Sequence, residues 1–413
     1  MENSNTVIPL LRFLGFSGKW KRKKIKDITA PAGRKNKQNL PYERYSISNE
    51  TGFYPQADQF EDGGGYLKDI DCRQYIIVPP KSFAYNPARI NVGSIGYQKI
   101  GKEVIVSSLY EVFQTNDEVD DRFLWQWFHT DVFHKMVLNV QEGGVRQYFF
   151  YDKLKECTIY LPSPDEQKKI AECLEAIDQM ISAQNQKVES LKTHKKGLMQ
   201  QLFPQPGATT PALRFPGFTG EWQEKKLNEV FSRVTRKNAE NNQNVLTISA
   251  QYGLISQLEF FKKSVASSDV TGYYLLHKGE FAYNKSSSQG RPVGAIKPLR
   301  LYDKGVVSTL YTCFKCNNPE EIDFWEQYFD AGILDSEILS IAQEGARNHG
   351  LLNISTGDFF GLNVILPTSP EMKKIAECLS SFDDVITAAE NELDSLKAHK
   401  KGLMQQLFPQ LQK

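Results

Sequence analysis

The sequence predicts two mixed α/β globular domains separated by two long helices, which pair antiparallel as an intramolecular coiled coil with approximate two-fold symmetry. Two observations lead to this prediction. The chain is duplicated, and each copy ends in a long stretch with the apolar periodicity of a coiled-coil helix. At 413 residues, the chain also exceeds what one hydrophobic core usually serves, which favours more than one domain.

The duplication is clearest at the start and at the end of each copy. Residues 9–28 return as residues 211–230, and the run HKKGLMQQLFPQ that begins at His194 recurs unchanged from His399. Residues 29–81 and 231–279 show no such likeness. The period is much longer than that of a solenoid repeat, so we expect a duplicated domain plus helix that carries two different inserts.

The long helices are expected over residues 163–203 and 369–413. In the first, Ser163 is the predicted N-cap, Pro164 takes the first helical position and Glu166 closes a capping box. Apolar residues then recur at alternating steps of four and three, the a/d seam of a coiled coil. The seam consists of Ile170, Leu174, Ile177, Ile181, Val188, Leu191, Leu198 and Leu202 in the first helix, and of Ile375, Leu379, Phe382, Ile386, Leu393, Leu396, Leu403 and Leu407 in the second.

Polar or small residues interrupt the seam at Gln184, Lys195, Ala389 and Lys400. Gln184 and the two lysines can set the register of the helix pair, or the lysines can simply extend their charges out of the seam. The Pro- and Gly-rich linker over residues 204–211 is short. It places the second domain near the end of the first helix and also near the start of the second, so paired helices must run antiparallel.

The remaining segments are predicted to be mixed α/β domains. Short β-rich pieces punctuated by Gly and Pro precede a helical piece over residues 121–140. The first domain is expected over residues 1–162 and the second over residues 212–368.

Composition restricts the possible partners and the compartment. The chain has 50 Lys and Arg against 49 Asp and Glu, so a nucleic-acid site requires local segregation of charge. No apolar run approaches the roughly 20 residues that a membrane span needs, and we expect a cytoplasmic protein. The six cysteines give no disulfide framework.

No catalytic constellation is visible in the sequence. The run from Gly96 to Lys102 fits the start of a phosphate-binding loop, but Glu103 stands where a magnesium-binding Ser or Thr is needed. Cys313 and Cys316 form a single CxxC, whereas a closed zinc site needs four ligands. We therefore expect a protein that is not an enzyme, without a metal or cofactor of its own.

Gly-rich loops with basic and amide side chains predict a DNA contact in each domain. One loop in each copy opens on Phe-Ala-Tyr-Asn, at residues 83–86 and 281–284, and another follows a repeated Gln-Glu-Gly. The alternative for any single residue is that Asn and Gly serve turns and that basic residues form a solvated face. The candidate DNA-binding residues are Asn86, Arg89, Tyr97, Gln98, Lys99, Arg146 and Gln147 in the first domain, and Asn284, Lys285, Ser286, Arg291, Lys297, Arg347, Asn348 and His349 in the second.

Over essentially the whole chain, this pattern resembles the specificity subunit of type I restriction-modification enzymes. The resemblance is carried by segments of the form LRFxGFxGxW, by the helix ends KKGLMQQLFPQ, and by the stretches YNPARINVGSIG and ILPTSPEMKKIAECL. It implies that each α/β domain is a target recognition domain that reads one part of a split DNA site. It also implies that the antiparallel helices set the spacing between the two parts.

The resemblance further implies the partners of the chain. Two modification subunits would dock on the helices, bind S-adenosylmethionine and methylate adenine, and restriction subunits with nuclease and translocase activity would cut unmodified DNA in host defence. Two other functions stay open at this point. An autonomous DNA-modifying enzyme lacks a visible cofactor loop, and a coiled-coil scaffold that binds only proteins leaves the paired basic loops without a role.

Overall fold

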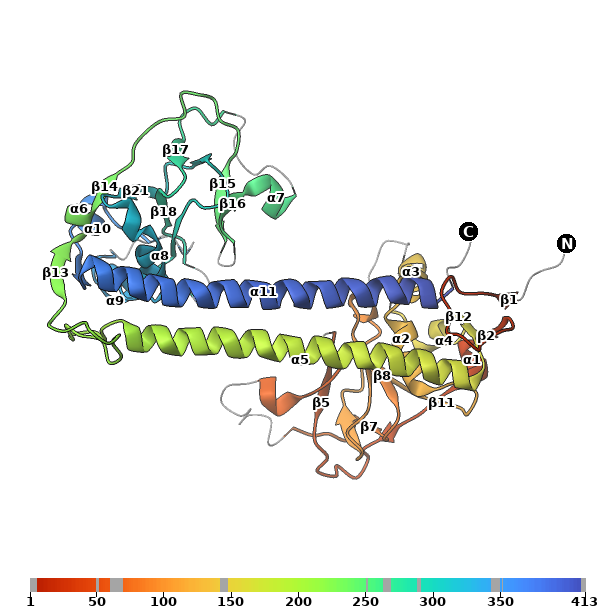
Figure 1. The fold of residues 1–413 in the computed structure, drawn as a ribbon. Coiled ribbons are helices and arrows are strands. Elements are labelled where there is room, and N and C mark those ends of the chain that lie inside the picture. The colour runs from red at the N-terminus through yellow and green to blue at the C-terminus, as the bar shows by residue number, and fades with distance from the viewer. Residues whose placement is uncertain are drawn as a thin grey trace. The chain divides into compact units, whose positions relative to one another are not determined.

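The computed structural model of the chain describes residues 6–49, 52–59, 70–141, 148–249, 252–262, 269–287, 291–342, 350 and 352–409. The chain divides into two compact units (Figure 1). Unit 1 consists of Met1–Asn185 with Glu392–Lys413, and unit 2 consists of Gln186–Asn391. These units differ from the domains drawn from the sequence because each takes in one end of both long helices.

The long helices are α5, Pro164–Leu202, and α11, Ser369–Leu407, with 39 residues each. In unit 2, Lys192 pairs with Glu390 at 2.8 Å and Lys195 pairs with Asp383 at 2.6 Å, so later residues of α5 meet earlier residues of α11. The helices are therefore antiparallel there, and the predicted fold class is confirmed. None of the helices in the described part of the chain has an apolar stretch long enough to span a bilayer.

The predicted seam is buried or partly buried along both helices. The two lysines that interrupt it make polar contacts, each within one unit. Lys195 pairs with Asp383 in unit 2, and Lys400 pairs with Asp178 at 2.6 Å in unit 1. Of the two roles considered for these lysines, the structure favours the one in which they fix the register, because each charge is paired across the two helices.

The start of α5 departs from the predicted capping box. The N–H of Glu166 donates to the Ser163 hydroxyl at 3.4 Å, as an N-cap requires. The Glu166 carboxylate does not return to the N-cap residue, because Arg12 holds it through two hydrogen bonds. The capping box is thus wrong in its second half, where a long-range ion pair replaces the local contact.

Unit 1 contains small antiparallel sheets covered by short helices (Figure 1). Its strand orders are β1-β2-β12, β3-β11-β8-β9, β10-β7-β4 and β5-β6. The strands are β1 Thr6–Val7, β2 Trp20–Lys24, β3 Thr29–Pro31, β4 Arg34–Lys35, β5 Tyr45–Ser48, β6 Gly52–Pro55, β7 Ile76–Val78, β8 Phe83–Tyr85, β9 Ile95–Tyr97, β10 Val104–Val106, β11 Glu111–Thr115 and β12 Thr158–Leu161. The helices are α1 Ile25–Ile28, η1 Gln56–Gln59, η3 Ile90–Val92, α2 Asp121–Phe128, α3 Asp131–Gln141 and α4 Tyr151–Leu154.

Unit 2 repeats this plan. Its strand orders are β13-β22, β14-β21-β18-β19, β15-β16 and β17-β20. The strands are β13 Gln223–Lys226, β14 Phe231–Arg233, β15 Leu246–Ser249, β16 Gly253–Ser256, β17 Tyr274–His277, β18 Phe281–Asn284, β19 Ala295–Pro298, β20 Lys304–Val307, β21 Thr312–Cys316 and β22 Asn363–Leu366. The helices are α6 Leu227–Val230, α7 Gln257–Phe261, η4 Pro319–Glu321, α8 Ile322–Asp330, α9 Asp335–Ile341 and α10 Thr356–Phe360.

The two inserts that share little sequence have the same backbone frame, so the expectation of two different inserts needs correction. The hairpin β5–β6 corresponds to β15–β16, and the pair β7–β10 corresponds to β17–β20. Asn36 and Asn238 build the same turn, since each side-chain oxygen accepts from the N–H four residues later at 2.9 and 2.8 Å. The repeated Arg-Lys-Asn at residues 34–36 and 236–238 was the signal for this likeness.

The end of each long helix completes the hydrophobic core of one unit. Phe408 is 2% exposed and contacts Phe123 of unit 1, with ring centroids 5.2 Å apart. Phe203 is fully buried and contacts Phe324 of unit 2 at 5.8 Å. This packing explains why the helix ends repeat so closely: the same apolar side chains fill the same position in two similar cores.

Candidate nucleic-acid interface

In unit 1, the candidate loops meet at one end of the sheet β3-β11-β8-β9. Strand β8 ends at Tyr85, which pairs with Ile95 at the start of β9 and with Glu111 at the start of β11. The loop over residues 86–94 and the turn over residues 107–110 therefore emerge side by side. We call this end of the sheet the loop edge of unit 1.

Unit 2 has the same arrangement. Asn284 at the end of β18 pairs with Ala295, and the neighbouring Tyr283 pairs with Thr312 at the start of β21. The described loop residues 285–287 and 291–294 and the turn over residues 308–311 thus form the loop edge of unit 2. Gly93 and Gly294 close the two loops with φ near +87°, and a Cβ on Gly294 would meet the Asn284 carbonyl oxygen, so that position requires glycine.

Phe149 and Leu352, which follow the repeated Gln-Glu-Gly in the two copies, contact the loops at the same edges. In unit 1, the N–H of Phe149 donates to the carbonyl of Pro87 at 3.0 Å. In unit 2, the N–H of Leu352 donates to the carbonyl of Lys285 at 3.0 Å. The candidates of these segments, Arg146, Gln147, Arg347, Asn348 and His349, lie outside the residues that the structure describes.

Asn86 and Asn284 open the two loops with the same turn. The side-chain oxygen of Asn86 accepts from the N–H of Ala88 at 2.9 Å, and that of Asn284 accepts from the N–H of Ser286 at 3.1 Å. These bonds are Asx-turns, which shape the backbone. Both asparagines therefore shape turns, which is the alternative to base contact considered for these residues.

The other candidates on the two loops differ in their exposure and in the contacts that they already make. Arg89 is exposed on the loop of unit 1, and Ser286 is exposed on the loop of unit 2. Lys285 is partly buried and donates to the carbonyl of Ile354 at 3.4 Å, and this burial lowers the pKa of its amine. Arg291 is partly buried and pairs with Asp330 at 3.2 Å.

Three candidates of unit 1 lie away from the loop edge. Strand β9 runs away from it, so Tyr97, Gln98 and Lys99 lie at the opposite end of the sheet. The Tyr97 hydroxyl donates to Asp121 at 2.7 Å, and Lys99 pairs with Glu175 of α5 at 3.2 Å. Gln98 is only 1% exposed, and its amide donates to the carbonyl of Lys102. We therefore remove these three from the proposed DNA-facing set.

Lys297 of unit 2 is corrected for the same reason. It lies within β19, is 9% exposed, and pairs with Asp330 at 2.6 Å and with Glu326 at 3.6 Å. Its charge is neutralised inside the unit by these two partly buried carboxylates, so the Lys297 amine is already paired and largely covered. The sequence around Lys297 contains no pattern that predicts this pairing.

Exposed aromatic side chains near the loop edge of unit 1 were missed from the sequence. Tyr148 and Phe150 are 49% and 48% exposed, and their rings stack with centroids 5.4 Å apart. They flank Phe149, which contacts Pro87 through the backbone. Exposed aromatic rings are typical of surfaces that contact nucleic-acid bases.

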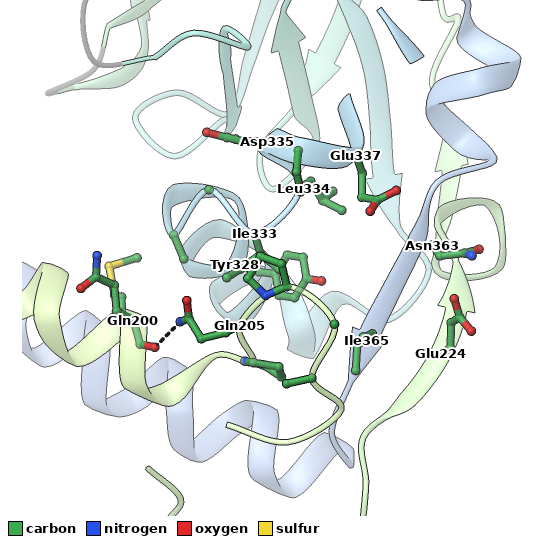
Figure 2. A pocket seen from close by; sticks show the side chains of 18 residues that line it. Gln200, Gln205, Glu224, Tyr328, Ile333, Leu334, Asp335, Glu337, Asn363 and Ile365 are labelled. Atoms are coloured by element: carbon green, nitrogen blue, oxygen red, sulfur yellow. Dashed lines mark hydrogen bonds between the residues drawn. The ribbon is translucent and has the colours of Figure 1, made fainter. Parts of the chain in front are cut away.

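A separate hollow of about 510 Å³ lies in unit 2 (Figure 2). Tyr328, Ile333 and Ile365 give it an apolar side, and Glu224 and Glu337 add negative charge to its lining. The linker forms another wall, held there by a hydrogen bond from the Gln205 amide to the carbonyl of Gln200 at 2.7 Å. Its acidic groups would repel phosphates, so we do not count it as part of the DNA interface.

Among the described residues, no three His, Cys, Asp or Glu side chains gather closely enough to hold a metal ion. Cys313 and Cys316 lie on the buried strand β21 with free thiols. Burial raises the pKa of the Cys313 thiol to about 12 and that of Cys316 to about 11. Both thiols are therefore protonated at neutral pH and poor nucleophiles.

Comparison with known proteins shows where this fold belongs. Residues 18–193 match the type I restriction modification DNA specificity domain. Along 393 residues, the chain is 26% identical to the type I restriction enzyme MjaVIII specificity subunit of Methanocaldococcus jannaschii, covering 86% of this chain and 85% of that protein. The chain is therefore similar to type I restriction-modification specificity subunits along most of its length.

Solved structures of type I restriction-modification proteins share the fold. The S subunit of the type I restriction-modification system from M. genitalium aligns with a TM-score of 0.58 at 14% identity, covering 98% of this chain and all of that one. A chain from a study of complex assembly and conformational transition of the type I restriction-modification system aligns with a TM-score of 0.54, also at 14% identity, covering 94% of this chain and 96% of that chain. The likeness spans both units and both long helices.

Proposed function

We propose that this specificity subunit reads a split DNA site, with the loop edge of unit 1 contacting one half-site and the loop edge of unit 2 contacting the other. The observation that carries the proposal is the repetition of one frame with different side chains. In both units a loop, a turn and a returning segment gather at the same end of the same sheet. Two domains with the same backbone frame but different surface side chains suit a DNA site whose two halves differ in sequence.

Within each edge, the residue types suggest how DNA is held. The exposed guanidinium of Arg89 and the partly buried amine of Lys285 suit phosphate or guanine contacts. In unit 1, Tyr148 and Phe150 offer exposed apolar surface on either side of Phe149, which contacts the loop at Pro87. Sequence discrimination would come from these loops together with the returning segments that hold Arg146 and Arg347.

We further propose that the chain is not itself catalytic and holds no cofactor. Two modification subunits would bind S-adenosylmethionine, dock on the equivalent helix surfaces of the two units and methylate adenine. Restriction subunits would join them, and the complex would act in the cytoplasm. The equivalent contacts of α5 and α11 in both units support two like docking surfaces. The helix pair would set the spacing between the half-sites.

The decisive experiment is a domain exchange. Residues 29–149 carry the loop edge of unit 1 but leave out Arg12 and α5, so the equivalent segment of a similar specificity subunit can replace them while the Arg12–Glu166 pair and both long helices are retained. Methylation-site sequencing of a host carrying the chain and its partners should show one half-site changed, with the other half-site and the spacing retained. If neither half-site changes, or both do, the assignment of one half-site to each unit is wrong.

A second measurement separates this function from that of a scaffold that binds only proteins. The assembled complex should shift a duplex bearing its site at salt concentrations where a scrambled duplex stays free. Equal binding of both duplexes would favour the scaffold. Methyl transfer by the purified chain alone would contradict the non-catalytic role.

A further inference from the structure

Each loop edge contains a turn whose sequence is nearly the same in both units. It reads Ser-Ser-Leu-Tyr between β10 and β11, and Ser-Thr-Leu-Tyr between β20 and β21. In unit 1, the N–H of Tyr110 donates to the carbonyl of Ser107 at 3.1 Å, and the N–H of Leu109 donates to the Ser107 hydroxyl at 3.4 Å. The first serine therefore closes the turn through both its backbone and its side chain.

The turn of unit 2 has the same bonds. The N–H of Tyr311 donates to the carbonyl of Ser308 at 3.0 Å, and the N–H of Leu310 donates to the Ser308 hydroxyl at 3.3 Å. The two loop edges thus contain turns with the same hydrogen bonds.

The tyrosine of each turn anchors it to the insert hairpin. In unit 1, the N–H of Ile47 on β5 donates to the Tyr110 hydroxyl at 3.4 Å. In unit 2, the Tyr311 hydroxyl is hydrogen-bonded to Thr247 and to the N–H of Ile248 on β15. Serine and tyrosine therefore have structural roles that explain their recurrence.

The leucine of the turn has no such role. Leu109 is 71% exposed and Leu310 is 62% exposed, although both belong to rigidly hydrogen-bonded turns. A single exposed leucine is ordinary on a protein surface. A leucine nevertheless occupies the same position in both units, although the neighbouring loops differ. This recurrence indicates that both units contact the same kind of feature on a binding partner.

We propose that Leu109 and Leu310 are apolar DNA contacts, one for each half-site, which press against a base-pair step and deform the duplex without reading its sequence. The inference rests on the proposed function, because it places DNA at the loop edges. The turn of unit 1 directly precedes β11, which pairs with the end of β8, and the turn of unit 2 directly precedes β21, which pairs with β18 near its end. Each turn therefore lies beside the neighbouring loop, and DNA bound by that loop would also meet the tip of the turn. A leucine cannot exchange hydrogen bonds with base edges. Apolar side chains that enter DNA act by unstacking a base step.

The test uses the subunit assembled with its partners and a duplex that carries the site found by methylation-site sequencing. 2-Aminopurine is placed in one half-site or in the other, because its fluorescence rises when its base is unstacked. We expect Leu109→Ala to abolish the rise in the half-site of unit 1 and Leu310→Ala to abolish it in the half-site of unit 2. Each change should weaken binding about fivefold, as expected for the loss of a small apolar contact, without altering the recognised sequence.

Leu14→Ala is the matched control, because Leu14 is 100% exposed outside both loop edges and should change neither fluorescence nor affinity. The thermal melting of all three variants should equal that of the parent, since these side chains contribute little to the core. Fluorescence and affinity that stay at parent values in both turn variants would overturn the inference. A loss of modification-subunit binding with unaltered base unstacking would also overturn it and would assign the turns to protein docking.

Failure of the inference and failure of the proposed function give different results. If the parent complex discriminates its site while both leucine variants match it, only the leucine contact is wrong. If the parent complex fails to discriminate its site, the proposed function itself fails.

Discussion

The guanidinium of Arg12 holds the carboxylate of Glu166 through paired hydrogen bonds, from Nε to Oε1 at 2.7 Å and from Nη2 to Oε2 at 2.6 Å. Glu166 is 1% exposed at the start of α5, and its hydrogen bonds raise the pKa of Arg12. Arg214 holds Glu371 of α11 in the same way, with both distances at 2.7 Å. Each pair ties the segment that opens one copy of the repeat to the first turn of a long helix.

Glu166→Gln should destabilise unit 1 by about 1–3 kcal/mol, because it removes the buried carboxylate that accepts two charged hydrogen bonds from the partly buried Arg12. Glu371→Gln should do the same to unit 2. Hydrogen exchange followed by mass spectrometry would locate the loss of protection in one unit for each variant. The control is Glu172→Gln, an exposed position on α5. Equal protection in Glu166→Gln and the control would contradict a stabilising role for the pair.

Phe408→Ala should destabilise the unit that contains the N-terminus. Phe408 lies near the end of the sequence, but its ring is buried among the core residues of unit 1. Replacing a buried phenylalanine by alanine costs about 3–5 kcal/mol. Limited proteolysis should therefore cut unit 1 sooner, whereas Phe203→Ala, the matched variant, should expose unit 2. Faster cleavage of unit 2 in Phe408→Ala would show that the core assignment is wrong.

Reversing one charge between the helices should weaken their pairing, and reversing both should restore it. Lys400 donates to Asp178 at 2.6 Å, and the Gln126 amide donates to the same carboxylate at 2.9 Å. Lys400→Asp should lower the stability of unit 1 by about 1–2 kcal/mol, because the pair is only partly buried. The double variant with Asp178→Lys should regain part of this loss in thermal melting. Additive losses in the double variant would mean that the two charges do not interact.

The stability of unit 1 should fall in acid partly because of Asp120. Burial opposes ionisation of this residue, but hydrogen bonds from Arg122 and Phe123 and the Arg122 charge outweigh burial and hold the pKa of Asp120 below its usual value. A carboxyl group with a lowered folded-state pKa stabilises the fold above its unfolded pKa of about 4, and this stabilisation is lost as pH falls through the lower folded value.

Asp120→Asn keeps an N-cap side chain but removes the charge, so its stability should depend less on pH between about 5 and 2. Asp120→Ala also loses the cap of α2, which should cost about 1 kcal/mol more at neutral pH. Urea unfolding across this pH range measures both effects. Parallel pH curves for the parent and Asp120→Asn would show that another group controls the acid response.

Arg89→Ala should weaken DNA binding by the assembled complex at moderate salt. Arg89 is the exposed basic side chain on the loop of unit 1, and one lost phosphate contact should reduce the salt slope of binding by about one. Lys168→Ala removes an exposed charge from α5 and serves as the control. If the two variants showed the same salt slope as the parent, Arg89 would not contact the backbone.

The paired helices were predictable from the sequence because their signal is periodic and local. A heptad seam requires only the spacing of apolar residues along one helix, and Ile170 and Leu174 are both buried where that spacing places them. The ends of the two helices have the same sequence, and the structure places Phe203 and Phe408 in similar cores. The linker between the copies then sufficed to predict that the helices run antiparallel.

The partners of charged side chains were not predictable in the same way. The basic residues Lys99 and Lys297 looked free for DNA, but Glu175 and Asp330 neutralise them from distant elements. Glu166 matched a local capping pattern, but Arg12 supplied a stronger partner. Pairing across the fold depends on which surfaces meet, and residue type carries no information about that.

The sequence by itself determined the duplication, the two helices and the kind of loop that we propose faces DNA, because repetition, periodicity and residue type are properties of short stretches. Only the tertiary structure decided which of those loop residues share one sheet edge. Strand pairing brings residues 86–94 and 107–110 together in unit 1 and sends Tyr97 to the opposite end. The reason is that strand direction and register, set by hydrogen bonds between distant segments, fix where a side chain emerges.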